Sequence, residues 1–491
     1  TMSVTAFAAD GNTLTVNVNS NQDLNGQTIS LYKLFDLSTS ENGENKNYAY
    51  TVNTATGYKE AIKSALGPSF TGTTDEDYAT AVKKLGADNE PGVQKFANDF
   101  TVYALKNGTN VKATTSEKIT GENTISHVFD ALDKGYYLVY VTGGKKVQSS
   151  LVTVDGSTTI SLKTEAPSIT KTADKDTVSI GQVVKYTVTG SVPDTTGYDQ
   201  YVYKIHDTLS NGLDFVNDEN GTPTSEGKVN VTVAFEKGVT DKGAAPTTAT
   251  LSGTGNRTMA LNLSKWVTAN QENNKGKAFT VTYYAKVNKA AVVTEKNKAQ
   301  LEYGNKPGET TTTTPSEAKT PTYPLDILKT KKGSEDILAD AHFTLYASTA
   351  EGNIDESKPI KVTKDEDGKY SYAADQASTD PSVITDMVTV ANKFEGTGYN
   401  LHINGLAAGT YYLKETKAPE GYNKLTDAIK VTIKKSITAN ENDWILTVDK
   451  GTVDGKIVKV ENSTGSLLPS TGGMGTIAFA VVAAILVFGV A

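Results

Sequence analysis

The chain has 491 residues, a modest net charge of −8 at pH 7 that is spread along its length, and no cysteine. This length predicts several domains; the absence of cysteine excludes a disulfide scaffold and cysteine metal sites, and the charge does not favour nucleic-acid binding. Many Thr, Val and Tyr residues, 42 glycines and short alternating segments favour an all-β chain of tandem Ig-like sandwiches. The four histidines are scattered, so we expect no metal site and no cofactor.

The first residues have the composition of a cleaved export signal. The tripeptide at 6–8, Ala-Phe-Ala, is an A-x-A-like cleavage site without the charged and apolar regions that normally precede one. We therefore expect residues 1–9 to be the remnant of a signal peptide and the mature protein to be extracellular.

Residues 10–163 are predicted to form the first domain, a sandwich with a helical insert. Apolar residues at helical spacing over 78–85 and 93–103 predict the insert, with Gly86 and Pro91 as breakers. The strand-like segments around it are 13–18, 28–37, 135–141, 148–154 and 158–163.

Residues 164–306 are predicted to form a second domain of strands and turns alone. A stretch at 307–322, rich in Thr and Pro, is predicted to be a linker or an extended, exposed connection. A third strand-rich domain follows at 323–463, and residues 464–491 form a C-terminal signal. Three such sandwiches in a row would make an elongated rod.

The C-terminal signal consists of a polar pentapeptide and an uncharged apolar run at 477–491. The pentapeptide is Leu468, Pro469, Ser470, Thr471 and Gly472. It resembles the sortase sorting signal of Gram-positive surface proteins, whereas an ordinary single-pass anchor would explain only the apolar run. Because the run is shorter than the roughly 20 residues needed to span a bilayer and lacks the family's basic tail, we expect the sequence to stop short of the natural end of the protein.

Polar residues occupy core-facing positions in the third domain. Side chains two residues apart share one face of a strand, and Lys329, Glu415 and Asn462 are each in phase with the apolar residues of their own strand. Burying any one of them unpaired is costly. We therefore expect the three side chains to meet.

The second domain repeats this pattern. Lys171, Asp207 and Asn297 are each in phase with apolar residues of their strands, with Glu236 as an alternative to Asp207. In both domains the alternative is an ordinary buried ion pair beside a hydrogen-bonded Asn.

The segment 411–422, Tyr-Tyr-Leu-Lys-Glu-Thr-Lys-Ala-Pro-Glu-Gly-Tyr, resembles the E-box of Gram-positive pilins and of collagen-adhesin repeats of the B type. The second domain, with Tyr-Lys-Ile-His-Asp-Thr-Leu at 203–209 and Asn-Lys-Ala at 297–299, resembles the fimbrial isopeptide-forming D2 type. Both families form Lys–Asn isopeptide bonds by themselves. The resemblance implies two cross-links, Lys171–Asn297 and Lys329–Asn462, with Asp207 and Glu415 as the catalytic carboxyl groups.

Burial supplies the chemistry of such a bond. It lowers the pKa of a lysine and raises that of a carboxyl group, which gives a neutral nucleophile and a proton donor. The carboxyl group would polarise the Asn carbonyl and relay protons as ammonia leaves, once per domain and without turnover. By analogy with a disulfide, each link would add a few kcal/mol of stability.

The first domain lacks the complete pattern. Lys33 is in phase with the apolar residues of its strand, but Tyr140 stands where the E-box has its Glu, and residues 148–163 contain no Asn. We predict no cross-link there and an ion-paired or snorkelling Lys33.

Polymerisation would require an exposed acceptor lysine at the end of the first domain. Lys163 is in phase with Thr159 and Ser161, opposite two apolar residues, and should face solvent. In the family this lysine follows Tyr-Pro, which is absent here, so a solvated edge-strand lysine is an equal alternative.

The resemblance implies the shaft subunit (major pilin) of a covalent, wall-anchored surface pilus. Sortase would cut between Thr471 and Gly472 and join Thr471 to a lysine of the next subunit. Expected partners are a pilin-specific sortase, identical subunits in a head-to-tail polymer, tip or minor pilins, and peptidoglycan, with a transient membrane segment before sorting and no nucleic acid. The alternative is a monomeric wall-anchored adhesin that binds a host matrix protein or glycan; no residue pattern supports an enzyme.

Overall fold

A computed structural model describes residues 11–20, 22–106, 108–162, 165–196, 198, 200–304, 307–308 and 310–471. Within these residues the chain is mostly β, with six sheets and four α-helices. The predicted signal remnant at 1–9, Lys163, Gly472 and the apolar run at 477–491 lie outside the described residues.

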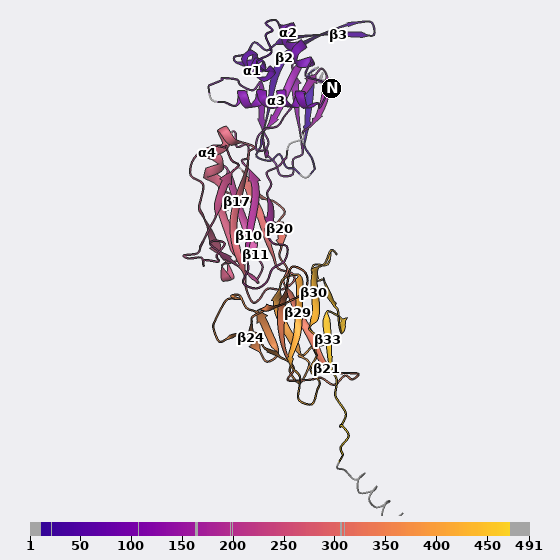
Figure 1. Cartoon of the computed structure of the whole chain (residues 1–491). Helices are drawn as coiled ribbons and strands as arrows, with labels where there is room; N and C mark the ends of the chain where they lie inside the picture. Colours follow the sequence, from indigo (N-terminus) through magenta and orange to yellow (C-terminus); the bar gives the residue numbers. More distant parts are fainter. Residues whose placement is uncertain are drawn as a thin grey trace, which may run out of the picture. The chain divides into compact units, whose positions relative to one another are not determined.

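The contacts divide the chain into two compact units (Figure 1). Unit 1 comprises Thr1–Asp176, Val183–Lys286 and Lys296–Lys319, and unit 2 comprises Thr177–Gln182, Val287–Glu295 and Thr320–Ala491. Unit 1 holds four sheets, which form the first and second sandwiches, and unit 2 holds two, which form the third. The all-β, tandem-sandwich fold predicted from the sequence is confirmed.

The first sandwich pairs a three-stranded sheet, β5-β1-β8, with the sheet β3-β2-β6-β7, to which β4 is added beside β2. The strands are β1 (Asn12–Asn17), β2 (Thr28–Asn42), β3 (Asn45–Val52), β4 (Thr115–Lys118), β5 (Ser126–Leu132), β6 (Gly135–Val141), β7 (Ser149–Val154) and β8 (Ser157–Ser161). One apolar cluster fills the space between the sheets, and a second lies between the larger sheet and the helices.

The helical insert consists of α1 (Tyr58–Leu66), α2 (Asp75–Lys83) and α3 (Pro91–Ala104). Thr74 and Asp77 form a capping box at the start of α2, and α3 begins on its proline. The predicted insert is thus confirmed for α2 and α3. The prediction missed α1, a nine-residue helix that buries Tyr58, Ala61 and Ile62.

The second sandwich pairs the sheet β12-β17-β10-β9, with β14 added beside β17, with the sheet β13-β15-β16-β11-β18-β19, with β20 added beside β18. Its elements are β9 (Thr170–Ala173), β10 (Val183–Ser191), β11 (Val202–Leu209), β12 (Leu213–Val216), β13 (Lys228–Asn230), β14 (Thr232–Phe235), β15 (Thr248–Ser252), β16 (Thr258–Asn262), α4 (Ser264–Asn274), β17 (Ala278–Val287), β18 (Lys296–Gly304), β19 (Thr310–Thr312), β20 (Ser316–Lys319) and a 3₁₀ turn at Thr254–Asn256.

Two predictions for this region were wrong. The second domain is not strands and turns alone, because α4 buries Trp266 and Val267 on one face. The stretch 307–322 is not only a connection: Thr310–Thr312 and Ser316–Lys319 form strands that pair with β18. Threonine favours a pleated, half-buried strand, so this composition suits β19 and β20 once β18 offers them a partner.

The third sandwich pairs the sheet β26-β24-β25-β28-β21-β33-β32 with the sheet β23-β22-β29-β30-β31, with β27 added beside β22. The strands are β21 (Tyr323–Lys331), β22 (His342–Ser348), β23 (Ile354–Pro359), β24 (Val362–Glu366), β25 (Lys369–Tyr372), β26 (Val383–Ile384), β27 (Met387–Val388), β28 (Leu401–Leu406), β29 (Gly409–Lys417), β30 (Ile429–Lys435), β31 (Trp444–Val448), β32 (Thr452–Asp454) and β33 (Ile457–Asn462). The first strand, β21, and the last, β33, lie side by side and pair in parallel.

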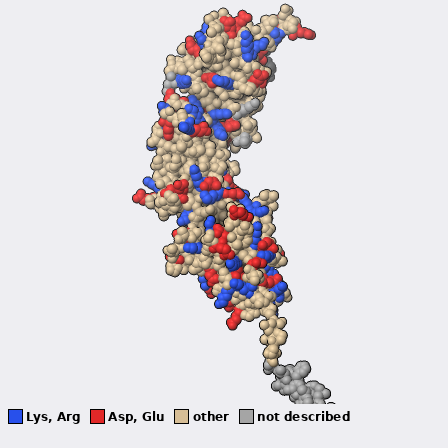
Figure 2. Space-filling model, viewed as in Figure 1, with Lys and Arg blue, Asp and Glu red and all other residues tan. Residues whose placement is uncertain are grey.

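Lys and Arg lie interspersed with Asp and Glu over much of the visible face (Figure 2). Among the described residues, no helix combines the length and the apolarity needed to cross a bilayer.

Candidate functional site

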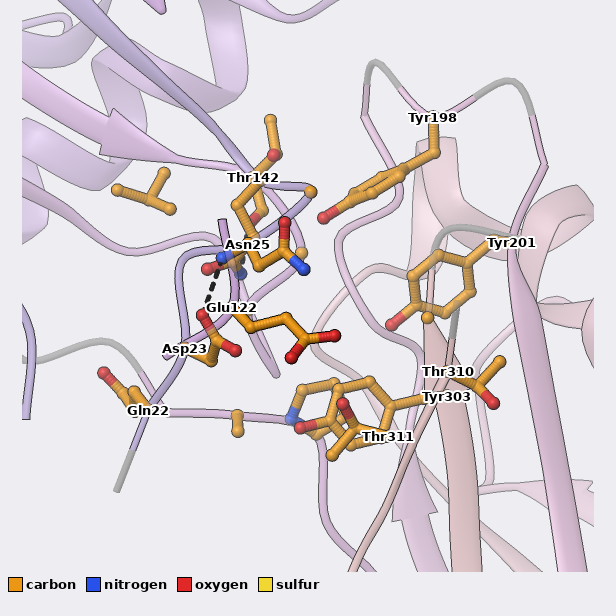
Figure 3. A pocket seen from close by; sticks show the side chains of 18 of the residues that line it. Gln22, Asp23, Asn25, Glu122, Thr142, Tyr198, Tyr201, Tyr303, Thr310 and Thr311 are labelled. Carbon is orange, nitrogen blue, oxygen red and sulfur yellow. Dashed lines mark hydrogen bonds between the residues drawn. The ribbon is translucent and has the colours of Figure 1, made fainter. Parts of the chain in front are cut away.

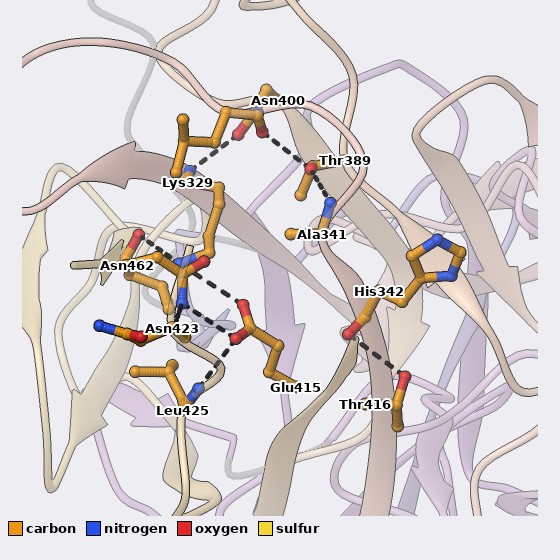
Figure 4. A network of polar contacts seen from close by, with 12 residues as sticks. Lys329, Ala341, His342, Thr389, Asn400, Glu415, Thr416, Asn423, Leu425 and Asn462 are labelled. Carbon is orange, nitrogen blue, oxygen red and sulfur yellow. Dashed lines mark hydrogen bonds and ion pairs between the residues drawn. The ribbon is translucent and has the colours of Figure 1, made fainter. Parts of the chain in front are cut away.

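Lys329, Glu415 and Asn462 meet in the core of the third sandwich, as their strand positions predict (Figure 4). Lys329 and Asn462 lie on the neighbouring strands β21 and β33, whereas Glu415 comes from β29 of the opposing sheet. All three side chains are buried, and Lys329 Nζ lies 3.6 Å from Glu415 Oε2.

The carboxyl group of Glu415 also holds the amide of Asn462. Its Oε1 accepts hydrogen bonds from Asn462 Nδ2 and from the backbone N–H of Leu425, both at 2.9 Å. Asn462 Nδ2 donates a second bond, also of 2.9 Å, to the backbone carbonyl of Asn423. The nitrogen that would leave as ammonia therefore lies in hydrogen-bond contact with the carboxyl group of Glu415. Strand parity did not identify Asn423 and Leu425, because they act through their backbone.

Lys329 is held at both ends. Its backbone N–H donates to Asn400 Oδ1 at 2.8 Å, and the Asn400 amide is itself anchored on two backbone carbonyls. Its Nζ lies 3.4 Å from the carbonyl oxygen of Val460. Burial lowers the pKa of Lys329 to about 8, although the neighbouring Glu415 opposes the shift. A useful fraction of the amine is therefore neutral, and nucleophilic, near neutral pH.

This lowered pKa predicts an unusual pH dependence in Asn462→Ala, which retains Lys329 but cannot form the cross-link. Between the folded pKa of about 8 and the unfolded value of 10.5 the unfolded state binds more protons, so stability should rise with pH. The gain should approach about 3 kcal/mol over this window. Pulse proteolysis of the third sandwich measures it, and Lys329→Met/Asn462→Ala is the matched control. An equal pH dependence in both variants would contradict the assignment.

Lys171, Asp207 and Asn297 meet in the second sandwich. Lys171 comes from β9 of one sheet, and Asp207 and Asn297 come from β11 and β18, neighbours in the other. Lys171 Nζ lies 2.6 Å from Asp207 Oδ2, and neither side chain is accessible to solvent. Glu236, the alternative carboxylate, is exposed. A bond between Lys171 and Asn297 would join the two sheets.

The second site is more aromatic than the third. The rings of Tyr186 and Tyr283 lie 4.3 and 4.4 Å from Lys171 Nζ. Burial lowers the pKa of Lys171 and raises that of Asp207, although the attraction between the two charges opposes both shifts. Both changes favour the neutral amine and the protonated acid. Sequence reasoning did not identify Tyr283, although its alternation with buried Val281 and Ala285 on β17 marks it as inward-facing.

Unsatisfied polar atoms gather at these two sites. Among the described residues, Asp207 Oδ1, both amide atoms of Asn297, Glu415 Oε2 and Asn462 Oδ1 are buried without a hydrogen bond of good geometry. The Asn297 amide nevertheless lies near enough to Asp207 to lower its pKa. A buried polar atom left unpaired costs about 1–3 kcal/mol, and native proteins contain few of them. Their concentration here requires an explanation.

The first sandwich differs as predicted at Lys33. Its Nζ lies 2.7 Å from Asp36 and 3.4 Å from Asp133, so the predicted ion pair is confirmed. Although burial opposes it, the hydrogen bond to Asp36 raises the pKa of Lys33. Tyr140, at the E-box position, instead donates a hydrogen bond to Asp194.

The described part of the predicted sorting motif is accessible. Residues 464–471 are exposed and lie outside regular secondary structure, with Leu468 at 88% exposure. Strand β8, which precedes Lys163, carries exposed Thr159 and Ser161.

Unit 1 also contains a polar pocket of about 430 Å³ (Figure 3). Its lining includes Asp23, Glu122, Tyr198, Tyr201 and Tyr303. It contains none of the residues predicted to react. The described residues include no group of His, Cys, Asp and Glu that could hold a metal ion.

Comparison with known proteins gives one family match. Residues 324–444 match the family model described as SpaA, a prealbumin-like fold domain. No curated protein matches the chain.

Several solved structures are similar. The T6 backbone pilin of Streptococcus pyogenes is 17% identical, with 93% of this chain and 99% of that one covered and a TM-score of 0.41. The major pilin SpaA of Corynebacterium diphtheriae is 16% identical, with 92% and 100% covered and a TM-score of 0.43. The pilus 2b backbone protein of group B streptococcus is 24% identical, with 61% and 99% covered and a TM-score of 0.39. Likenesses of this strength carry no inference about function.

Proposed function

We propose that this chain is the shaft subunit of a covalently polymerised pilus on the surface of a Gram-positive bacterium. Its second and third sandwiches each close an internal isopeptide bond, Lys171–Asn297 and Lys329–Asn462. The observation that carries the proposal is the pair of dry Lys–carboxyl–Asn clusters in one chain without cysteine. An accessible Leu-Pro-Ser-Thr motif follows the cluster of the third sandwich.

The clusters are suited to one amide exchange each. The neutral lysine amine attacks the Asn carbonyl carbon, a C–N bond forms, and the bond to the amide nitrogen breaks. One proton passes from the lysine nitrogen, through Asp207 or Glu415, to the nitrogen that leaves as ammonia. The fold supplies proximity, so no external catalyst is required. The exchange removes the Asn NH2 group from each site and leaves a secondary amide, whose N–H can donate to a carboxyl oxygen that is otherwise unpaired.

The exposed motif suits a sortase substrate. A pilin-specific sortase would cut between Thr471 and Gly472 and transfer the Thr471 acyl group to a lysine of the next subunit, for which Lys163 is our assignment. Transfer to peptidoglycan would anchor the polymer to the wall, and tip or minor pilins would join by the same chemistry.

Lys163→Ala in the producing bacterium tests the proposal. The wild-type chain should give a ladder of high-mass species that survives boiling in detergent, and Lys163→Ala should collapse it to a monomer. Lys146→Ala, which removes an exposed lysine at another position, is the control and should keep the ladder. A single wall-linked band from the wild-type chain would instead support a monomeric adhesin. A ladder that persists in Lys163→Ala would overturn the acceptor assignment.

A further inference from the structure

The second-sandwich site contains a fourth polar group, the hydroxyl of Tyr283. This side chain is fully buried on β17. Its Oη accepts a hydrogen bond from Lys171 Nζ at 2.5 Å and donates one to Asp207 Oδ2. Because Lys171 Nζ also lies 2.6 Å from Asp207 Oδ2, amine, phenol and carboxyl close a three-membered ring of hydrogen bonds.

The ring gives the two carboxyl oxygens of Asp207 different surroundings. Oδ2 is occupied by Lys171 and Tyr283, while Oδ1 has no hydrogen-bond partner among the described residues. The Asn297 amide is buried beside this carboxyl group with both of its polar atoms unpaired. Oδ1 is therefore the oxygen that remains for the amide.

Tyr283 also stays in its neutral, proton-donating form. Burial, and next the charge of Asp207, raise its pKa well above the ordinary value of 10.0. A phenol that remains protonated can donate to the carboxylate while it accepts from the amine. It can therefore pass a proton along without becoming charged.

Within the described part of the chain, the lysine of the third sandwich has no tyrosine hydroxyl among its hydrogen-bond partners. Among the described residues, Lys329 Nζ contacts the backbone carbonyl of Val460 and the carboxyl group of Glu415. The other oxygen of Glu415 is held by Leu425 and Asn462. The two proposed reactions thus differ in how the carboxyl group is positioned.

We propose that Tyr283 is a catalytic residue of the second-sandwich cross-link, in which it carries a proton from Lys171 Nζ to Asp207 and turns the carboxyl group so that Oδ1 serves Asn297. The inference rests on the proposed Lys171–Asn297 bond. The balance is that of the exchange above: Nζ loses one proton as its bond to the Asn297 carbonyl carbon forms. That proton reaches Asp207 through the phenol, and Asp207 delivers a proton to the departing nitrogen.

The test follows bond formation during cell-free synthesis of the full chain, with aliquots denatured and mapped for the branched Lys171–Asn297 peptide. Tyr283→Phe should slow its appearance at least about ten-fold. Tyr186→Phe is the matched control, because its ring also covers Lys171 Nζ, and it should stay within about two-fold of the wild type. The branched Lys329–Asn462 peptide of the same molecules is an internal kinetic reference, and its rate of appearance should be unchanged.

Two further measurements separate catalysis from folding. Replacement of Tyr283 by 4-aminophenylalanine retains a para group that donates and accepts hydrogen bonds, and it should restore most of the rate. The pH–rate profile of Tyr283→Phe should also be broader on both sides, because the reactive form pairs a neutral Lys171 with a protonated Asp207. Without the phenol, Asp207 loses a donor to its ionised form and Lys171 loses an acceptor, while Tyr186 and the Asn297 amide remain.

Each outcome bears on the inference. A wild-type rate in Tyr283→Phe, or no rescue by 4-aminophenylalanine, would overturn the role of Tyr283 and leave the proposed bond standing. If the wild-type chain never forms the Lys171–Asn297 peptide, the proposed bond falls and the role of Tyr283 falls with it.

Discussion

Glu415→Ala is expected to restore one ammonia to the intact mass of the protein and to destabilise the third sandwich strongly. The wild-type chain should lack two ammonia equivalents, one for each proposed bond. Without Glu415 the Asn462 amide loses the carboxyl group that holds its nitrogen at 2.9 Å. Lys329 should then fail to displace that nitrogen.

The loss of stability has two physical sources. Lys329 would remain buried without its partner, and removing one member of a buried ion pair costs about 3–5 kcal/mol. Without the cross-link, the unfolded chain between β21 and β33 would also gain conformational entropy. By analogy with a disulfide, this gain lowers the free energy of unfolding by about 4–5 kcal/mol. The two costs overlap, since an uncross-linked domain can relax around the lysine.

Intact mass, branched-peptide mapping and pulse proteolysis of the third sandwich together measure this effect. Lys331→Ala is the matched control, because Lys331 lies on the same strand and pairs in register with Asn462 but is only partly buried. It should keep both ammonia losses. Two losses in Glu415→Ala, or none in the wild type, would refute the assignment of the site.

Asp207→Ala is expected to abolish the Lys171–Asn297 link and to make the second sandwich the most fragile part of the chain. Lys171 would then lie between two tyrosine rings with no counter-charge. The site is fully buried, so the full cost of an unpaired buried charge applies, about 3–5 kcal/mol.

Two further variants separate the loss of the cross-link from the loss of the counter-charge, and Asp207 from Glu236 as the catalytic carboxyl group. Asn297→Ala also loses the link but keeps the ion pair, so its protease resistance should fall between those of the wild type and Asp207→Ala. Glu236→Ala removes the exposed alternative carboxylate and should retain the branched peptide. Loss of that peptide in Glu236→Ala, with retention in Asp207→Ala, would reverse the assignment of the catalytic carboxyl group. Peptide mapping is the readout, because a single melting temperature is not defined for a chain of several domains.

The inward direction of the side chains proposed to react could be predicted from the sequence. Alternation along a strand is a local property with a period of two residues, so Lys329 and Asn462 could be assigned to the core from their own neighbours. Their burial confirms it. The proposed sorting motif was equally readable, because a linear peptide signal requires no fold.

The arrangement of each site required the tertiary structure. The alternation of side chains along the strands left Asp207 and Glu236 as alternatives. Only the packing of β11 against β9 decided which carboxyl group meets Lys171. Parity could not tell that Lys329 and Asn462 lie on neighbouring strands of one sheet while Lys171 and Asn297 come from opposing sheets.

The sequence by itself thus determined which side chains enter the cores and that the chain carries a Leu-Pro-Ser-Thr-Gly motif, because strand alternation and a linear motif are both local. The tertiary structure decided which carboxyl group meets which lysine, and it brought Tyr283 and the backbone of Asn423 to the two sites. Strand pairing and sheet packing join residues far apart in the chain, and backbone groups leave no trace in side-chain identity. These contacts therefore exist only once the chain has folded.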